Sequence, residues 1–283
     1  MSLSLAASHD PNNKKRRQRP QWLTALGLRL TAWWADAMLS LEFIGQLLMT
    51  LPRLLRGKTT LRAVDLLWHL DQAGPRSVGI VCLVSGLVGV IFAYMGAIQL
   101  QRFGAQTYIA DLVTVGMVRE VAALMTGVIL AGRIGAAYAA QLGSMQANEE
   151  IDALRALGID PMEHLVLPRV LALVIAAPFL VAFAALVAIA MGWAVAVAIF
   201  GVAPLEYGYK SLHALTVPHV LIGLAKGTFY CLLVALAGCR QGLNSGRSAQ
   251  DVGNAVTASV VQAIVWIVIA ASASTVALQR LDW

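Results

Sequence analysis

Long apolar stretches, each bounded by polar residues, dominate the chain from residue 77 onwards. Five of them cover about residues 77–100, 112–142, 170–202, 217–237 and 252–278. Each is long enough for the ~20 residues that a helix needs to cross a bilayer. The second and third exceed that length, so they must tilt, bend or project, and Pro178 predicts a bend in the third. We therefore predict an all-helical (all-α) integral membrane protein with about five transmembrane helices.

The residues before the first of these stretches follow a different pattern. Residues 1–20 are polar and basic, and we expect them to be disordered. Residues 21–56 combine spaced arginines, leucines and three tryptophans, which predicts an amphipathic helix in the membrane interface. Residues 59–73 predict a second amphipathic helix, which Gly74-Pro75 ends. The expected organisation is a disordered N-terminus at 1–20, interfacial helices at 21–76 and a transmembrane domain at 77–283.

Composition agrees with a membrane protein. The chain is 59% hydrophobic and 13% charged, and its mean hydropathy is +0.72, well above that of a soluble domain. No cleavable signal peptide is expected, because no short apolar segment with a small-residue cleavage site follows the first basic run. The net charge is +6, but eleven of the 21 Lys and Arg residues precede residue 77. Anionic lipid headgroups are therefore a better partner for them than nucleic acid.

The positions of Lys and Arg also predict an orientation. With the N-terminus in the cytoplasm, cytoplasmic segments hold 15 of the 21 and outer segments hold three, as the positive-inside rule requires. Most of this difference comes from the N-terminal segment. The orientation places the connection between the second and third spans in the cytoplasm and the C-terminus outside.

That connection is unusually polar. Residues 131–169 hold three arginines and five carboxylates. Asn148 predicts a helix start, with Glu149 and Glu150 in the first turn, and Gly158 predicts the helix end. The apolar residues of this short helix recur at helical spacing: Ile151, Leu154 and Leu157. An apolar stripe beside an acidic flank suits a rigid contact with a partner protein; a solvated connection is the alternative.

A second helix start follows at once. Asp160 can cap it, Pro161 suits its first position, and Glu163 completes a capping box. We expect this helix to lead through Pro168 and Arg169 into the third span.

Four charged residues fall inside the predicted spans. Arg119, Glu120 and Arg133 lie in the second span and Lys226 lies in the fourth. Intramembrane charges usually face a bundle interior or a water-filled cavity. At ~100° per residue, Arg119 and Arg133 fall within about 40° of one helix face. The alternatives are snorkelling of Arg119 or its pairing with Glu120, which is also a possible partner of Lys226.

No sequence motif points to catalysis. The chain has no G-x-x-x-x-G-K-[ST] phosphate loop, and its five histidines show no metal-ligand spacing. Cys82, Cys231 and Cys239 lie in apolar stretches and are expected to be core residues. The odd number of spans argues against an inverted repeat within one chain, so two-fold symmetry would require a second copy.

Several motifs occur together between residues 119 and 261. They are Arg119-Glu120, A-G-R-I-G at 131–135, A-x-L-G-x-M at 140–145, E-x-I-D-A-L-R-A-L-G-I-D-P at 149–161, L-P-R at 167–169 and D-x-G-N-A-V-T-x-S-V-V at 251–261. Together they resemble the MlaE/YrbE family, the permease subunits of Mla-type phospholipid ABC transporters. The resemblance covers about residues 60–280.

The resemblance implies a multi-pass protein of the bacterial inner membrane that works as a homodimer. It implies a cytoplasmic P-loop ATPase that binds ATP and Mg, a periplasmic MCE-domain protein, and a phospholipid substrate, with no cofactor in this chain. It also implies a coupling helix at about 145–157, in which Glu149 and Asp152 match the family's acids. We predict that this segment contacts the ATPase through Met145, Glu149, Glu150, Asp152, Leu154 and Arg155. Arg119, Glu120 and Arg133 match charged positions of the family. Together with Lys226, which only its position inside a span singles out, we predict that they line the substrate cavity.

The chain departs from the family pattern in places. Val121-Ala122-Ala123 stands where Leu-Gly-Pro is usual, Gln141 replaces an acid, and Glu150 stands where Gln is common. Some relatives carry an N-terminal STAS domain, but residues 1–58 are too short and basic for one, so a STAS-domain partner would be a separate protein. Two other functions stay open at this point. One is a proton- or ion-coupled secondary transporter using Glu120 and Lys226, and the other is a membrane scaffold that transports nothing.

Overall fold

The computed structural model describes residues 31, 34, 38–50, 52, 62–105 and 108–280 of the 283-residue chain. An apolar helix covers Met38–Thr50, inside the segment predicted to form an interfacial helix. The prediction of disorder at 1–20 and most of the predicted 21–56 helix lie outside the described residues.

The five predicted spans are confirmed. Five helical runs of the described part are long and apolar enough to cross a membrane: Ala63–Arg102, Ile109–Ala147, Met162–Ala198, Val217–Leu243 and Ala249–Arg280. The first run consists of α2 (Ala63–Ala73) and α3 (Pro75–Arg102), which Gly74 separates. Gly74-Pro75 therefore ends the short amphipathic helix as predicted.

The second span extends beyond both of its predicted ends. It contains three α-helices and two π-helical turns: α4 (Ile109–Gly116), η2 (Met117–Val121), α5 (Ala122–Leu130), η3 (Ala131–Gly135) and α6 (Ala136–Ala147). Such π-helical turns insert extra residues into a helix and are frequent at functional sites. The uniform angle per residue that placed Arg119 and Arg133 on one face does not hold across them.

The polar connection is shorter than predicted. It contains α7 (Glu150–Ala156), and the next helical run begins at η4 (Met162–Val166) and continues as α8 (Leu167–Ala198). The third span thus starts eight residues before its predicted start at residue 170. Asp160 caps this run as predicted, because its Oδ1 accepts a hydrogen bond from the Met162 backbone N–H at 2.9 Å. Pro178 lies inside α8 without ending it.

Three helices complete the fold. They are α9 (Pro204–Ala214), α10 (Val217–Leu243) and α11 (Ala249–Arg280). The amphipathic helix α9 was not predicted. It places Tyr207 in the core beside α4, where burial raises the pKa of the Tyr207 hydroxyl to about 12.

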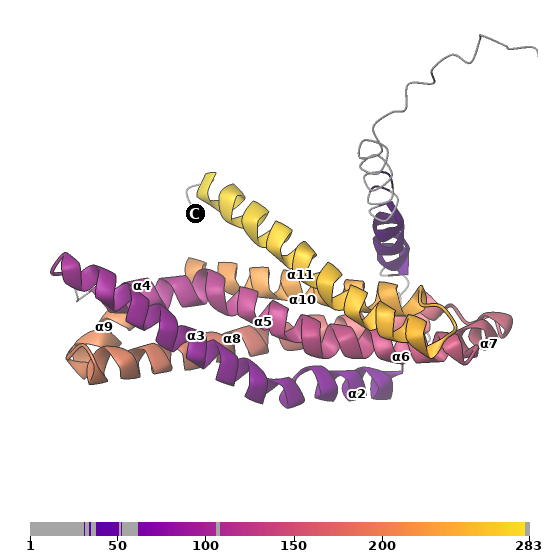
Figure 1. Ribbon diagram of the computed structural model, residues 1–283, viewed down its shortest axis with the longest axis horizontal. Helices are drawn as coiled ribbons and strands as arrows, with labels where there is room; N and C mark the ends of the chain where they lie inside the picture. The colour runs from indigo at the N-terminus through magenta and orange to yellow at the C-terminus, as the bar shows by residue number, and fades with distance from the viewer. Residues whose placement is uncertain are drawn as a thin grey trace, which may run out of the picture. The chain divides into compact units, whose positions relative to one another are not determined.

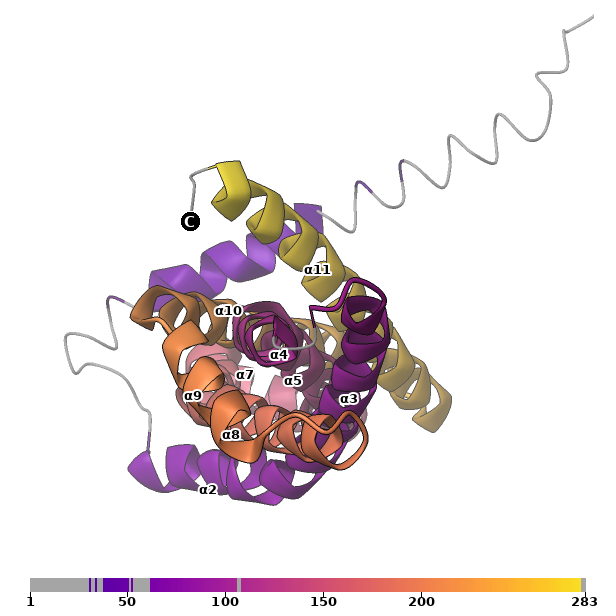
Figure 2. The ribbon, with the colours of Figure 1, turned by 90° about the vertical axis from the view of Figure 1, so that its left-hand side faces the viewer.

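The second span lies at the centre of the bundle. Viewed from the α4–α9 end, α4 and α5 are surrounded by α3, α8 and α10 (Figure 2). The helix α3 packs mainly on α8, and α10 contacts both α8 and α11. Figure 1 shows α4 and α9 at one end of the bundle and α7 at the other.

Glycines let α10 approach the second span closely. A Cβ atom on Gly223 would lie 1.9 Å from the Val118 carbonyl oxygen, and one on Gly238 would lie 2.6 Å from the Gly135 carbonyl oxygen. Both contacts are with backbone, which cannot rotate away. Close helix contact through small residues is the usual way in which membrane helices associate.

Candidate functional site

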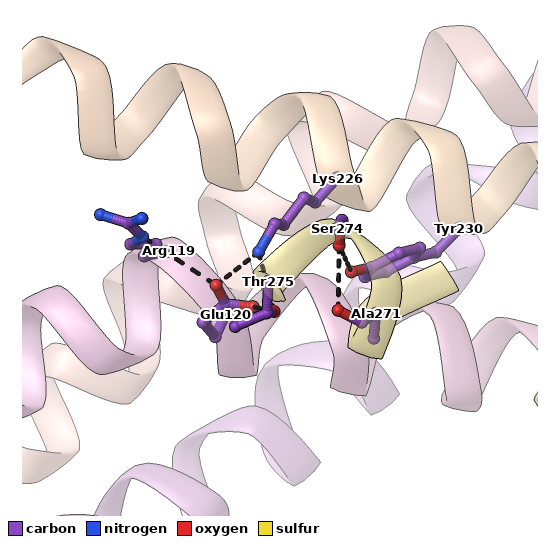
Figure 3. Close-up of polar contacts among 7 residues, drawn as sticks. All are labelled: Arg119, Glu120, Lys226, Tyr230, Ala271, Ser274 and Thr275. Atoms are coloured by element: carbon purple, nitrogen blue, oxygen red, sulfur yellow. Dashed lines mark hydrogen bonds and ion pairs between the residues drawn. The ribbon is translucent and has the colours of Figure 1, made fainter. Parts of the chain in front are cut away.

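A charged cluster joins three spans inside the bundle (Figure 3). Lys226 of α10 donates a hydrogen bond from Nζ to Glu120 Oε1 in η2. Lys226 Nζ also donates to Thr275 Oγ1 of α11 at 3.2 Å, and Thr275 Oγ1 donates to Glu120 Oε2 at 3.2 Å. The three side chains therefore contact one another in a closed triangle. We call these three residues and Arg119 the charged cluster.

Arg119 adds a second positive charge to this cluster. Its Nε lies 3.9 Å from Glu120 Oε1, so the pairing considered from the sequence does occur. The Lys226 side chain is 5% exposed, whereas Arg119 and Glu120 keep 21% and 33% of their side-chain surfaces exposed. Lys226 thus forms the closed side of the cluster, and Arg119 and Glu120 form the accessible side.

The cluster lies at membrane depth. Glu120 and Lys226 are about 16 Å and about 14 Å from the first residues of their spans at 1.5 Å per residue. A charge at this depth is stable only when it is paired or faces water. One carboxylate between two cations leaves a net positive charge, which can attract an anion such as a phosphate group.

A second polar contact lies beside the cluster. The Tyr230 hydroxyl and Ser274 Oγ are 3.3 Å apart, and Ser274 Oγ also donates to the Ala271 carbonyl oxygen at 3.0 Å (Figure 3). These contacts join α10 to α11 next to the Lys226–Thr275 contact. Hydroxyl groups in the last span gave no clear signal in the sequence, and their role follows only from the packing.

Arg133 does not join the charged cluster. It is exposed and has no partner among the residues that the structure describes. Fourteen residues separate it from Arg119, a rise of about 21 Å along one span. The structure thus brings three of the four predicted intramembrane residues together and leaves the fourth apart.

At the other end of the bundle, α7 starts differently from the prediction. Asn148 ends α6 and does not cap α7, and α7 begins at Glu150 after Glu149 with φ +62°. The reason is that α6 continues five residues past the predicted end of the span at residue 142, so Asn148 is the C-cap of α6. Non-glycine residues rarely adopt the left-handed conformation, and such positions cluster at functional sites. The predicted stop at Gly158 is confirmed, with φ +76°.

Arg247 holds this turn. It lies in the connection between α10 and α11, and its Nη1 and Nη2 donate to Glu149 Oε1 and Asp152 Oδ2, each at 3.0 Å. Arg155 Nη1 donates to the other Asp152 oxygen at 3.2 Å. The acids predicted to contact a partner thus also bind within the chain. The sequence showed Arg247 only as one more loop arginine.

The faces of α7 differ in burial. Ile151 is fully buried, Leu154 is half-buried, and Leu157 is 75% exposed. Glu150 is exposed and accepts a hydrogen bond from the Asn148 side-chain amide at 3.3 Å. The expected stripe therefore anchors the helix at Ile151 and leaves Leu157 to solvent.

Met145 is not part of this short helix. The expected coupling segment began at residue 145, but Met145 lies in the last turns of α6. Its side chain lines a cavity between α2, α6 and α8.

Two further cations, which the prediction of orientation places in cytoplasmic segments, lie inside helices. Arg169 and Arg240 are buried inside α8 and α10, with 6% and 3% of their surfaces exposed. Arg169 donates from Nη1 to the Leu165 carbonyl oxygen at 2.7 Å. For metal ions, the described part of the chain has no group of three His, Cys, Asp or Glu residues that could bind one.

Comparison with known proteins gives a consistent result. The family model described as Permease MlaE matches residues 66–277, within the stretch for which the motifs indicated a resemblance. A probable ABC transporter permease protein of Synechocystis is 29% identical over 240 residues, which cover 85% of this chain and 89% of that protein. A probable ABC transporter permease protein of Rickettsia typhi is 32% identical over 196 residues, which cover 69% of this chain and 76% of that protein.

A plant relative is similar to the same extent. The chloroplastic protein TRIGALACTOSYLDIACYLGLYCEROL 1 of Arabidopsis thaliana is 32% identical over 219 residues, which cover 77% of this chain and 62% of that protein. Relatives therefore include probable ABC transporter permeases of bacteria and a chloroplastic protein, and the chain is a multi-pass membrane protein. It is a non-catalytic permease subunit of an ABC transporter, and it belongs to the MlaE permease family.

Proposed function

We propose that this permease works as a homodimer that moves phospholipid between the bacterial inner membrane and a periplasmic MCE-domain protein. A separate P-loop ATPase, which binds ATP and Mg, would drive the movement from the cytoplasm, and a separate STAS-domain protein could join the complex. Family membership supports the ATPase partner. The name of the Arabidopsis relative is that of a galactolipid, which supports a lipid as substrate.

The observation that carries this proposal is the tethering of α7. The ATPase would contact the exposed side of α7, through Glu149, Glu150, Asp152, Leu154 and Arg155. Arg247 bonds to two of these acids, so a displacement of α7 would also move the start of α11. Because α7 follows α6 directly, the same displacement would reach the second span.

The charged cluster would lie on the lipid route. Arg119, Glu120 and Lys226 lie where the second span meets α10 and α11. A net positive charge at this depth favours a phosphate group over the acyl chains alone. Arg133 is exposed in a single copy of the chain. In the dimer it would line the lipid cavity further along the second span.

The orientation follows from the placement of the positive charges. We propose that the N-terminus and α7 face the cytoplasm and that the C-terminus faces the periplasm. In this orientation the charged cluster lies in the half of the bundle nearer the periplasm, where an MCE-domain protein would bind.

Co-purification followed by reconstitution tests this function. The full chain, carrying an affinity tag, is purified from native membranes in a mild detergent, and bound proteins are identified by mass spectrometry. We expect a P-loop ATPase and an MCE-domain protein. Reconstituted into liposomes, the complex should exchange labelled phospholipid with ATP and not with a proton gradient alone.

Two rival functions predict different results in the same experiment. A secondary transporter using Glu120 and Lys226 would move its substrate with a proton gradient and no ATPase. A scaffold would bind partners and move no lipid in any condition. The mutual pairing of Glu120 and Lys226, with Thr275 between them, supports a fixed cluster and not a free proton carrier.

A further inference from the structure

A second polar site lies at the α7 end of the bundle, far from the charged cluster. A cavity of about 890 Å³, which we call the α2–α6 pocket, has walls from α2, α6, η4 and α8. Gln141 of α6 lines it and follows Glu120 by 21 residues in the same span, a rise of about 30 Å. The two sites are therefore separate.

The floor of the pocket carries buried polar atoms without partners. Arg169 and His69 line the pocket, each is 6% exposed, and neither Arg169 Nε nor His69 Nδ1 has a hydrogen-bond partner. Gln141 Oε1 is also buried and unpartnered. Unsatisfied buried polar groups cost about 1–3 kcal/mol each, and three of them belong to residues that line one cavity, which favours a polar ligand there.

These side chains are held in place by packing. The His69 ring contacts the rings of Trp68 and Tyr138 edge-on, with centroids 4.9 Å and 5.9 Å away. The Tyr138 hydroxyl donates to the Arg169 carbonyl oxygen at 3.3 Å. Arg169 and His69 are thus positioned in advance of any ligand, which lowers the entropic cost of binding.

The pocket lies at the depth of lipid headgroups. On α2, Val64, Leu67 and Trp68 are exposed apolar side chains, and Trp is typical of the membrane interface. Asp71 at the end of α2 and Arg76 at the start of α3 form an ion pair at 2.9 Å with both side chains more than half exposed. Such a pair is stable in the headgroup region and costly among acyl chains.

The charges in the pocket select the headgroup. Arg169 is a permanent cation that binds phosphate well, and His69 and His164 add imidazoles. Asp65 of α2 lies in the same wall, and a carboxylate there disfavours a purely anionic ligand. The combination matches a zwitterion, with its phosphate at Arg169 and its ammonium group at Asp65 and Gln141 Oε1.

We propose that the α2–α6 pocket binds the headgroup of a membrane phospholipid that carries a phosphate and a primary ammonium group, of the phosphoethanolamine kind. The lipid comes from the leaflet at the α7 end. Its acyl chains lie along Val64 and Trp68, the exposed apolar side chains of α2 that line the pocket. This proposal requires only that the chain spans a membrane and does not depend on the proposed transport function.

Native mass spectrometry of the full chain in nanodiscs tests the site. The discs contain equal amounts of phosphatidylethanolamine, phosphatidylglycerol and phosphatidylcholine, and the lipids retained after removal of the disc are identified. We expect the wild-type protein to retain phosphatidylethanolamine at least threefold over its share of the mixture. Ser144→Trp, which fills the pocket from an exposed wall position of α6, should remove this enrichment.

A matched variant controls for the added ring. Leu67→Trp places the same side chain on α2 but in the apolar groove on its other flank, so the enrichment should remain. Asp65→Asn should retain phospholipid but lose the preference for phosphatidylethanolamine over phosphatidylglycerol. Arg169→Gln should abolish retention of phospholipid. Because Arg169 is buried, its substitution can also disturb the fold, so this result supports the site only when Ser144→Trp gives the same loss.

Three outcomes would overturn the proposal. The first is unchanged enrichment in Ser144→Trp, and the second is an equal preference for phosphatidylglycerol in the wild type. The third is displacement of the lipid by millimolar inorganic phosphate, which would identify a free-phosphate site. Enrichment in the nanodiscs without ATP-driven exchange in the reconstituted complex would refute the transport proposal alone, so failure of that proposal and failure of this one are distinguishable.

Discussion

Arg247 donates a hydrogen bond from Nη1 to Glu149 Oε1 at 3.0 Å, which joins the connection between α10 and α11 to the residue before α7. Glu149 has the left-handed φ of +62°, so its backbone conformation costs about 1–2 kcal/mol. The pairing of Arg247 with both Glu149 and Asp152 offsets part of that cost. A strained turn held by one arginine is a suitable place for a partner to act on the bundle.

The first prediction concerns these acids. Charge reversal at both positions, Glu149→Arg with Asp152→Arg, should abolish the stimulation of ATP hydrolysis by the permease while membrane insertion remains normal. The physical reason is that both changes repel Arg247 and remove the acidic flank of α7. The measurement is the ATPase rate of the reconstituted complex with and without phospholipid, and normal ATP-driven transport would contradict the coupling role.

A compensating substitution separates two explanations of that effect. Adding Arg247→Glu restores opposite charges across the contact. If the tether within the chain is what matters, the triple variant recovers ATPase stimulation. If α7 acts only through a direct contact with the ATPase, stimulation stays lost. Stability should change by about 1 kcal/mol or less in either variant, because exposed ion pairs contribute little.

The second prediction concerns the charged cluster. Glu120→Gln leaves the Lys226 ammonium buried without its carboxylate, and removing one partner of a buried pair costs about 3–5 kcal/mol. We expect the lower end of this range, because a third of the Glu120 side chain is exposed. The unfolding temperature of the purified protein in detergent should fall clearly.

The double variant Glu120→Gln with Lys226→Met serves as the comparison. Replacing both partners of a buried pair by neutral groups is often neutral or stabilising, so most of the lost stability should return. An unfolding temperature of Glu120→Gln equal to that of the wild type would show that the pair contributes nothing to the fold.

The third prediction concerns the close contact of α10 with the second span. Gly223→Ala places a methyl group 1.9 Å from the Val118 carbonyl oxygen, so the two helices must separate. We expect the free energy of unfolding to fall by at least about 1–3 kcal/mol, as for other overpacked contacts. In Gly79→Ala, on α3, the added methyl group has no neighbouring atom within 4 Å. The free energy of unfolding of this variant should therefore lie within about 1 kcal/mol of the wild-type value. Equal unfolding temperatures for the two variants would contradict the contact.

The number and order of the spans could be predicted because the bilayer sets a minimum apolar length. Their ends could not, because a helix that leaves the membrane continues into polar residues without a change of backbone. The second span continues past Leu142 to Ala147, and the third begins at Met162 within the polar connection. Gly158 was predictable because its turn needs a positive φ.

The candidate site was predictable only in part. Charges within apolar stretches identified Arg119, Glu120 and Lys226, because such charges are costly without a function. Thr275 and Arg247 were not identifiable, since their partners lie 155 and 98 positions away in the chain. The start of α7 depends on how far α6 continues, so a local helix-start signal pointed to Asn148 instead of Glu150.

The last prediction tests the lipid role of the charged cluster. Arg119→Ala removes the more exposed of its two cations, while Glu120 keeps its contacts with Lys226 and Thr275. The fold should therefore persist, but the net positive charge that attracts a phosphate group is lost. We expect lower phospholipid content in the purified complex by mass spectrometry. Arg76→Ala, which breaks an exposed ion pair with Asp71, should leave the content unchanged. Equal lipid content in Arg119→Ala and the wild type would rule out a role for Arg119 in lipid binding, because any remaining lipid would then be bound without this charge.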